Sequence, residues 1–307
     1  MIYTVTLNPA VDYLLYLPEM RIGEIQRSDR EIFDFSGKGI NVSKVLTELG
    51  VETTALGFLA GFTGRAISEA LAEDGVRQDF CFLPSGNTRV NVKLRHGRET
   101  DINGQGPDIP EASIGALLWK LRGLTDKDIL VLAGSCPKRL RRTIYAEILE
   151  KVAPTGVTTV VDADGELLRY ALPMRPFLVK PNREELSGIL GKPLDSDGAV
   201  LEGARKLMEY GARNVLVSLG GDGAILCAES GEGYRIGAVS GTCVNSIGAG
   251  DSMIAGFLAG YLSGGGDFEA ALRLGSAAGA ASAFSEGLGT RLEIEALLRR
   301  VPAPVRI

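Results

Sequence analysis

The sequence has few of the residues from which metal centres and disulfide frameworks are built. Its 307 residues include a single histidine, His96, and four cysteines that show no CxxC spacing. Zinc sites combine several closely spaced cysteine and histidine ligands, and disulfide frameworks occur in short, cysteine-dense chains. We therefore expect neither a zinc site nor disulfide bonds, and we expect reduced thiols in a cytoplasm.

Long apolar runs and an excess of basic charge are also missing. No uncharged apolar segment approaches the roughly 20 residues that span a membrane. The apolar segment 1–7 has no basic residues before it and is soon followed by Asp12, so we expect no secretory signal. The formal net charge is −5, which disfavours a nucleic-acid partner but allows a small basic pocket for an anionic metabolite. We expect a cytoplasmic protein with no membrane partner.

Two common nucleotide-binding patterns do not occur. The chain has no GxxxxGK[ST] run, and Gly248-Ala249-Gly250 is followed by Met253 where a dinucleotide fingerprint has its third glycine. These absences disfavour Walker-type and dinucleotide-binding sites.

The composition is that of an ordinary folded protein, with 45% hydrophobic and 23% charged residues. From about residue 111 onward, helical periodicity alternates with short β-branched runs, the expected strands being 129–132, 157–161, 177–179 and 215–217. This order predicts an α/β fold with a mostly parallel sheet, covered by helices on both faces and binding ligands beyond the carboxyl ends of its strands. Chains of this length commonly form one unit in such folds, so we expect a single domain, 1–307.

Two segments, at about 12–35 and 88–104, do not show this alternation of helices and buried strands. They contain strand-like alternation, clearest at 89–94, with a turn expected at 96–98. They hold too few apolar residues for a core of their own. We expect a small β-layer that packs over the main domain as a lid, against a second subunit, or both.

The run Gly248-Ala249-Gly250-Asp251 opens directly into an apolar helical segment. Free N–H groups in a first helical turn attract an anion, and glycines let it approach the backbone. An aspartate there repels phosphate, which makes sense if Asp251 accepts a proton from a hydroxyl that attacks the phosphorus. The alternative is a simple turn in which Asp251 only complements the helix dipole.

A second glycine corner, at 36–42, also precedes an amphipathic helix and presents Lys38 and Asn41 to a polar ligand. Strand spacing places Arg89 and Lys93 on one face, and these cations together with Lys38 suit a dianion. The alternatives are ordinary helix entry with a solvated Lys38, and a strand edge protected by basic residues.

Two further segments carry polar or glycine-rich patterns. Asn182 and Glu185 are three residues apart at an expected helix start, where they either hold a hydrated Mg²⁺ or form a capping pair. The glycine-rich segment 218–224 joins two strands, either as a plain hairpin or as bare backbone against which a ring or phosphate lies.

Read in order, six motifs resemble the ribokinase-like (phosphofructokinase B type) sugar kinase family over nearly the whole chain. They are Thr6-Leu7-Asn8-Pro9-Ala10-Val11-Asp12, Gly37-Lys38-Gly39-Ile40-Asn41-Val42, Thr88-Arg89-Val90-Asn91-Val92-Lys93, Lys180-Pro181-Asn182-Arg183-Glu184-Glu185-Leu186, Val217-Ser218-Leu219-Gly220 and Gly248-Ala249-Gly250-Asp251-Ser252. The chain is most similar to the hexose-phosphate branch, and within it to members that act on fructose 1-phosphate. The run 100–107 adds to that similarity.

The resemblance implies a three-layer αβα sandwich with a mostly parallel central sheet and a small β-sheet lid, which often forms a homodimer interface. It implies ATP- and Mg²⁺-dependent phosphorylation of fructose 1-phosphate at its C6 hydroxyl, giving fructose 1,6-bisphosphate. Kinases of tagatose 6-phosphate or fructose 6-phosphate are the alternatives in the same family. A non-catalytic module that binds a sugar phosphate or nucleotide is a second alternative.

The resemblance also implies roles at matching positions. Asp251 is the implied base, with an anion hole formed by Gly248, Ala249 and Gly250. The implied substrate contacts are Asp12, Gly37, Lys38 and Asn41, with Arg89 and Lys93 facing the phosphate already on the sugar. The implied nucleotide side comprises Lys180, Asn182, Ser218, Gly220 and Gly223, and Asn182 and Glu185 are the implied Mg²⁺ residues, acting through water.

The chain departs from the family pattern in two places. Where the family usually has Gly-Ser-Leu-Pro-x-Gly, this chain has Cys136 at the leucine and ends Lys138-Arg139, so a turn glycine is missing and two cations are added. Where the family usually has Asp-x-Ser-Gly, Asp164 replaces the serine. The roles of these four residues stay open, with the substrate phosphate as a candidate partner of Lys138 or Arg139.

Overall fold

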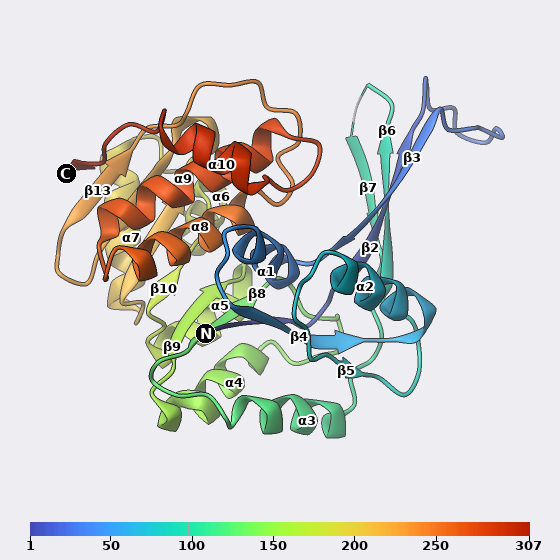
Figure 1. Ribbon diagram of the computed structural model, residues 1–307, viewed down its shortest axis with the longest axis horizontal. Helices are drawn as coiled ribbons and strands as arrows, with labels where there is room; N and C mark the ends of the chain where they lie inside the picture. Colours follow the sequence, from blue (N-terminus) through green and yellow to red (C-terminus); the bar gives the residue numbers. More distant parts are fainter. Residues whose placement is uncertain (98) are drawn as a thin grey trace.

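The computed structural model describes residues 1–97 and 99–307, which form two β-sheets of unequal size and the helices packed around them (Figure 1). The turn expected at 96–98 includes Arg98, which lies outside the described residues. Within that described part of the chain, no helix combines the length and the apolar character needed to cross a bilayer.

The larger sheet contains ten strands among the described residues. Their order in space is β14 (Val305–Arg306), β13 (Gly233–Ile236), β12 (Ala224–Cys227), β11 (Asn214–Ser218), β10 (Leu178–Val179), β9 (Thr158–Asp162), β8 (Ile129–Ala133), β1 (Ile2–Thr6), β4 (Thr53–Leu59) and β5 (Cys81–Phe82). Neighbouring strands from β11 to β5 are parallel, and β12, β13 and β14 form an antiparallel edge. The mostly parallel sheet predicted from the β-branched runs is confirmed.

Helices cover both faces of this sheet. One face carries α1 (Lys38–Glu48), α2 (Gly61–Glu73), α8 (Ala249–Ser263), α9 (Phe268–Phe284) and α10 (Arg291–Leu298). The other carries α3 (Glu111–Leu121), α4 (Ile144–Val152), α5 (Gly165–Ala171), α6 (Arg183–Leu190) and α7 (Asp197–Glu209), with short 3₁₀ turns at Ala153–Thr155 and Leu172–Met174. Each face buries an apolar cluster, and the three-layer αβα prediction is confirmed.

The chain leaves β1 and β8 toward opposite layers. β1 is followed, after the small sheet's first strands, by α1 on one face, whereas β8 is followed by α4 on the other. Because β1 and β8 are parallel neighbours, their carboxyl ends border a crevice at a topological switch point, where open α/β sheets bind ligands.

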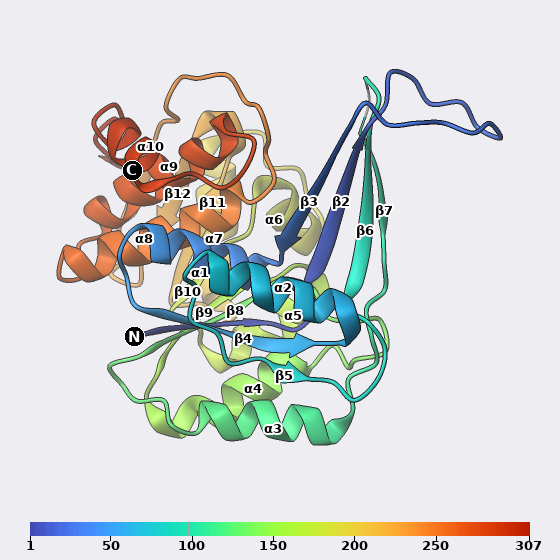
Figure 2. The same cartoon turned by 45° about the vertical axis from the view of Figure 1, so that its right-hand side comes forward.

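The smaller sheet stands away from the main body (Figure 2). Its order is β3 (Arg30–Ser36), β2 (Ala10–Tyr16), β6 (Arg89–Arg95) and β7 (Glu99–Asn103). These strands lie within or at the borders of the segments 12–35 and 88–104, which do not show the α/β alternation in the sequence. The small separate sheet expected for this fold class is therefore present.

The two faces of the smaller sheet differ in polarity. One row of paired residues contains Asp12, Asp34, Asn91 and Asn103, and the next row contains Tyr13, Phe33, Val92 and Ile102. Successive rows of a sheet point to opposite faces. The sheet thus has a polar face that reaches the site described next and an apolar face with exposed Phe33 and Ile102.

Candidate active site

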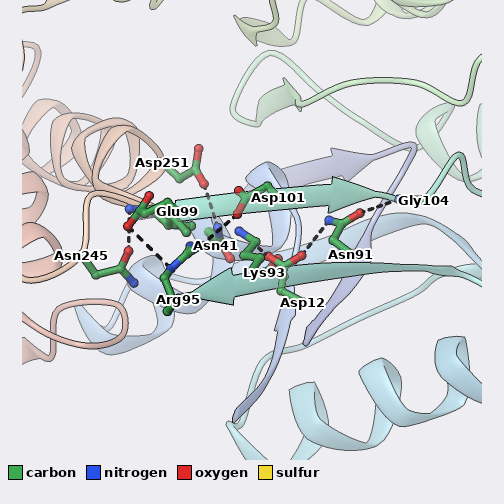
Figure 3. A network of polar contacts seen from close by, with 12 residues as sticks. Asp12, Asn41, Asn91, Lys93, Arg95, Glu99, Asp101, Gly104, Asn245 and Asp251 are labelled. Atoms are coloured by element: carbon green, nitrogen blue, oxygen red, sulfur yellow. Dashed lines mark hydrogen bonds and ion pairs between the residues drawn. The ribbon is translucent and has the colours of Figure 1, made fainter. Parts of the chain in front are cut away.

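Asp251 and the second glycine corner meet, although 210 residues separate Asp251 from Asn41. Asp251 lies in the first turn of α8, after Gly248, whose φ of 80° is left-handed. Its side chain is buried, and Asn41 of α1 donates from Nδ2 to Asp251 Oδ2 at 2.8 Å (Figure 3). The packing of α1 against α8 therefore brings two predicted site segments together.

The first turn of α8 offers two unused donors. Ala249 N donates to Ser246 O and Ser252 N to Gly248 O, whereas within the described residues the N–H groups of Gly250 and Asp251 have no acceptor. A Cβ on Gly250 would lie 3.1 Å from Lys180 Nζ, so glycine leaves room for this ammonium beside the helix start. Two amides, the positive end of the helix dipole and a lysine form a corner that attracts an anion.

Burial dominates the protonation of Asp251. Burial and, to a smaller extent, the charge of Asp162 raise the pKa of this carboxyl. The hydrogen bond from Asn41 and the charges of Lys38 and Lys180 oppose the rise, and the net pKa is about 7. A carboxyl whose pKa lies near neutrality is suited to exchange a proton with a substrate at neutral pH.

Asp162 holds two lysines at this site. It ends β9 at the carboxyl edge of the sheet, and its Oδ1 lies 3.4 Å from Lys38 Nζ and 3.5 Å from Lys180 Nζ. Burial lowers the pKa of Lys38, but Asp162 and other nearby carboxylates outweigh burial and raise it overall, so Lys38 stays cationic. The sequence patterns assign no role to Asp162; its place at the carboxyl end of a strand is the signal that identifies it.

Asp12 is the centre of a buried polar group on the smaller sheet (Figure 3). Its carboxylate lies 3.1 Å from Lys93 Nζ and accepts hydrogen bonds from Asn91 Nδ2 at 2.7 Å and Ser36 Oγ at 2.9 Å. The resemblance places Lys93 at the substrate's phosphate; in the structure this residue is 7% exposed and its ammonium pairs with Asp12. Asn91 is a neighbour that sequence reasoning missed, although it lies between Arg89 and Lys93 at the same alternating spacing.

A cleft of about 530 Å³ separates the smaller sheet from α1 and from the loops before α8 and α10. Asp12, Asn41 and Lys93 line it, and so do Arg30 and Glu286, which form a bidentate ion pair at 2.7 and 3.0 Å. This pair ties the smaller sheet to the loop after α9. Arg89 does not line this cleft; it lines a second one at the base of the sheet.

Asn182 and Glu185 form a reciprocal capping box at the start of α6. Asn182 Oδ1 accepts from Glu185 N at 2.7 Å, and Glu185 Oε2 accepts from Asn182 N at 2.8 Å. The capping alternative is therefore realised, and it leaves the second oxygen of Glu185 outside the box. Across residues 1–97 and 99–307, no cluster of three or more His, Cys, Asp or Glu side chains is arranged to hold a metal ion.

The strand β11 brings the glycine-rich hairpin beside this cap. Ser218 N donates to Pro181 O at 3.1 Å, and a 3₁₀ turn at Gly220–Asp222 leads into β12. Gly223 has a φ of 104°, and a Cβ there would lie 2.1 Å from Ile236 O, so only glycine fits. At Gly220 nothing lies within 4 Å of an added Cβ, which leaves bare backbone facing open space.

This arrangement, an acidic group beside free helix-start amides at the carboxyl edge of an αβα sheet, agrees with a comparison of the chain with known families. The description "pfkB family carbohydrate kinase" matches residues 6–295. The chain belongs to the pfkB family of carbohydrate kinases. The resemblance carried by the six motifs is thereby confirmed, and the protein is an ATP-dependent carbohydrate kinase.

Members of the pfkB family with similar sequence cover nearly the whole chain. A 1-phosphofructokinase of Bacillus subtilis is 44% identical over 301 residues, which is 98% of each chain. A D-tagatose-1-phosphate kinase of Bacillus licheniformis is 36% identical over 94% of each chain. Phosphofructokinase-2 of Escherichia coli, solved with fructose-6-phosphate, aligns with a TM-score of 0.89 at 27% identity, over 97% of this chain and 98% of the other.

Proposed function

We propose that this kinase transfers the γ-phosphoryl group of ATP to the C6 hydroxyl of fructose 1-phosphate, giving fructose 1,6-bisphosphate and ADP. The observation that supports the reaction is the buried carboxyl of Asp251, held by Asn41 beside the unused amides of Gly250 and Asp251. The choice of sugar follows the 1-phosphofructokinase that is 44% identical over nearly the whole chain. We place the reaction in the cytoplasm.

In the proposed mechanism, Asp251 takes the proton of the C6 hydroxyl while the hydroxyl oxygen forms a bond to the γ-phosphorus. The bond from that phosphorus to the β,γ-bridging oxygen breaks, and ADP leaves with the electron pair. The free amides of Gly250 and Asp251, at the start of α8, bind the oxygens of the migrating group, and Lys180 adds a positive charge beside them. The residues Asp12, Gly37, Lys38 and Asn41 orient the sugar, so positioning accounts for much of the acceleration.

We assign the nucleotide to the side of the site that α6 and the β11–β12 hairpin form. Lys180 and Asn182 face its phosphates, and Ser218, Gly220 and Gly223 offer backbone against which it lies. A Mg²⁺ ion bound with ATP would offset the negative charge of the phosphates. The donor set suits a hydrated ion: the carboxylate of Glu185 has an oxygen outside the capping box, Asn182 lies beside it, and Asp162 Oδ2 is buried without a partner in the described residues.

Closely related sugars are the main alternatives. Fructose 6-phosphate, found with the Escherichia coli structure, reverses the positions of phosphate and hydroxyl. D-Tagatose 1-phosphate, the substrate named for the Bacillus licheniformis relative, differs from fructose 1-phosphate only at C4. Tagatose 6-phosphate combines both differences. A non-catalytic binding module is disfavoured because a carboxylate facing a phosphate site opposes binding unless it accepts a proton.

A steady-state assay of ADP release separates these functions. Fructose 1-phosphate is expected to give the highest kcat/KM in a panel with fructose 6-phosphate, both tagatose phosphates and unphosphorylated fructose. Turnover is expected to require Mg²⁺ and to stop when EDTA removes it. A clear preference for another sugar would reassign the substrate. If no sugar in the panel supports ADP release, the kinase function is contradicted.

We further propose that the smaller sheet forms a homodimer interface through its apolar face. Phe33 is 57% exposed and stacks on Tyr13, and Ile102 is 58% exposed in the same row. A second copy covering this row would bury apolar area that the monomer leaves in water.

The wild-type protein is expected to sediment as a dimer and the Ile102→Glu variant as a monomer. Leu292→Glu, at an exposed residue of α10, is the control; dimeric Ile102→Glu would exclude this interface.

A further inference from the structure

A second cleft, of about 470 Å³, lies at the carboxyl ends of β1, β8 and β9, where the base of the smaller sheet meets the main body. It coincides with the topological switch point between β1 and β8. The β8–α4 loop, part of which lines the cleft, also packs against Lys38, since an added Cβ on Gly134 of this loop would lie 3.5 Å from Lys38 Cβ. The cleft therefore adjoins the cluster around Asp251 but has its own lining.

Three cations line this cleft: Arg89 from β6, and Lys138 and Arg142 from the loop after β8. Among the residues that the structure describes, none of the three has a carboxylate within ion-pair distance. The contact recorded for Arg142 is with the thiol of Cys136, whose Sγ lies 3.0 Å from Nη1. These positive charges are therefore available to an anion that enters the cleft.

The other two arginines of the same loop are arranged differently. Arg139 pairs with Asp108 at 2.7 Å, and Arg141 pairs with Glu111 at 2.8 Å. Neither lines the cleft. The loop thus divides its four cations into two that the protein already neutralises and two that it directs into the cleft.

Two buried polar atoms in the cleft wall also lack partners within the described residues. They are Oδ1 of Asn8, a side chain that is 6% exposed, and Nε of Arg89. Burial lowers the pKa of Arg89, although the charge of Asp12 partly opposes this. Unpaired buried polar groups cost free energy, and a ligand that supplies their partners removes that cost. A sugar hydroxyl suits the acceptor on Asn8, and a phosphate oxygen suits the donor on Arg89.

Two carboxylates, Asp164 and Glu166, also line the cleft. Both are exposed, whereas Arg89 is partly buried and Asn8 is fully so. The carboxylates therefore belong to the rim, where they can accept hydrogen bonds from the hydroxyls of a sugar. The cations exceed them by one charge, and water screens the exposed acids more than it screens the partly buried Arg89 and Arg142.

We propose that Lys138 and Arg142, together with Arg89, bind the phosphate that the sugar carries before the reaction, and that they make the kinase specific for a phosphorylated acceptor. This inference rests on the proposed function. Fructose 1-phosphate carries its phosphate and its C6 hydroxyl at opposite ends, so it spans from this cleft to Asp251. Lys93 lines the other cleft, where its ammonium pairs with Asp12 at 3.1 Å, so we assign it no part in this phosphate site.

The test compares Arg142→Gln and Lys138→Gln with Arg139→Gln, a matched control on the same loop. The first two variants are expected to raise KM for fructose 1-phosphate by roughly 10- to 100-fold, the effect of losing a charge-assisted hydrogen bond. KM for ATP is expected to change by less than about twofold, as is every constant of the control. Arg142→Lys is expected to recover part of the loss.

Binding without ATP gives the second readout. Calorimetry is expected to show that wild type and Arg139→Gln bind fructose 1-phosphate far more tightly than fructose, and that the other two variants lose most of this difference. Lys138 is exposed, so Lys138→Gln keeps the test valid if Arg142→Gln does not fold.

The outcomes separate this inference from the proposed function. Variants of Lys138 and Arg142 that behave like the Arg139 control overturn the inference, as does a loss confined to kcat. If the wild type prefers fructose 6-phosphate and both variants raise KM for that sugar, the phosphate site stands and only the substrate is reassigned. Absence of turnover by the wild type with every phosphorylated sugar overturns the proposed function, and equal affinity for fructose 1-phosphate and fructose then overturns the inference too.

Discussion

Replacing Asp251 by asparagine is expected to lower kcat by roughly 10²- to 10⁴-fold, the loss typical of removing a general base. The amide is as large as the carboxyl and still offers an oxygen to Asn41, but it accepts no proton from the sugar. Affinity for ATP is expected to change little, because the amides at the start of α8 and the hairpin after β11 stay in place. Steady-state kinetics and ATP titration measure both quantities.

The pH profile tests the same role. Burial raises the pKa of Asp251 to about 7, so kcat/KM of the wild type is expected to fall as the pH drops through that value and the base becomes protonated. Asp251→Asn is expected to lack this acid limb. Because the raised pKa makes ionisation oppose folding, the stability contributed by the protonated form is lost as pH rises through about 7. At pH 8 we therefore expect Asp251→Asn to have a higher Tm than the wild type.

Asp126→Asn is the matched control. Asp126 is exposed in the loop before β8, at the amino ends of the strands, whereas Asp251 lies at their carboxyl ends. It is expected to leave turnover, pH profile and Tm unchanged. An Asp251→Asn variant that keeps most of its turnover, or keeps the acid limb, would show that another group accepts the proton.

Replacing Asp12 by leucine is expected to destabilise the fold by about 3 kcal/mol, since it leaves a buried lysine without its partner. Lys93 is 7% exposed and lies 3.1 Å from the Asp12 carboxylate, and Ser36 and Asn91 lose their acceptor at the same time. Thermal denaturation is expected to show Tm lower by roughly 5 °C. KM for the sugar is expected to rise because Asp12 lines the cleft.

The double variant Asp12→Leu/Lys93→Met separates the two effects. It removes both charges, and a buried ion pair replaced by apolar side chains is often neutral in stability. We expect Tm to recover by at least about half, while KM for the sugar stays high because the carboxylate that faces the cleft is still absent. Recovery of both would reduce Asp12 to a structural role, and recovery of neither would show that the pair is not the source of the stability loss.

Local motifs predicted much of the site because their chemistry depends on a few neighbouring residues. The turn at Gly248 and the helix after it, the cap of α6 by Asn182, and the hairpin after Ser218 all form where the sequence places them. In each case the signal is a glycine or a capping side chain next to an apolar run, and such signals act within one helical turn or one hairpin.

The partner of a charged side chain is decided by residues far away in the sequence. Strand spacing places Arg89 and Lys93 on one face, but the pairing of β6 with β2 sets Lys93 against Asp12, 81 positions away, and leaves Arg89 in another cleft. The loop after β8 shows the same limit. Its four cations look alike in sequence, and only the packing around Asp108 and Glu111 separates Arg139 and Arg141 from the two that face the cleft.

The sequence alone determined the alternation of helices and strands, the family, and the two glycine corners with Asp251 and Lys38. These features depend on short-range periodicity and on motifs of neighbouring residues. The tertiary structure decided that Asn41 holds Asp251, that Asp162 joins Lys38 to Lys180, and that Lys138 and Arg142 share a cleft with Arg89. These contacts join residues that lie in different strand–helix units of the fold. Strand order and register set them, and both arise from burying apolar area across the whole chain.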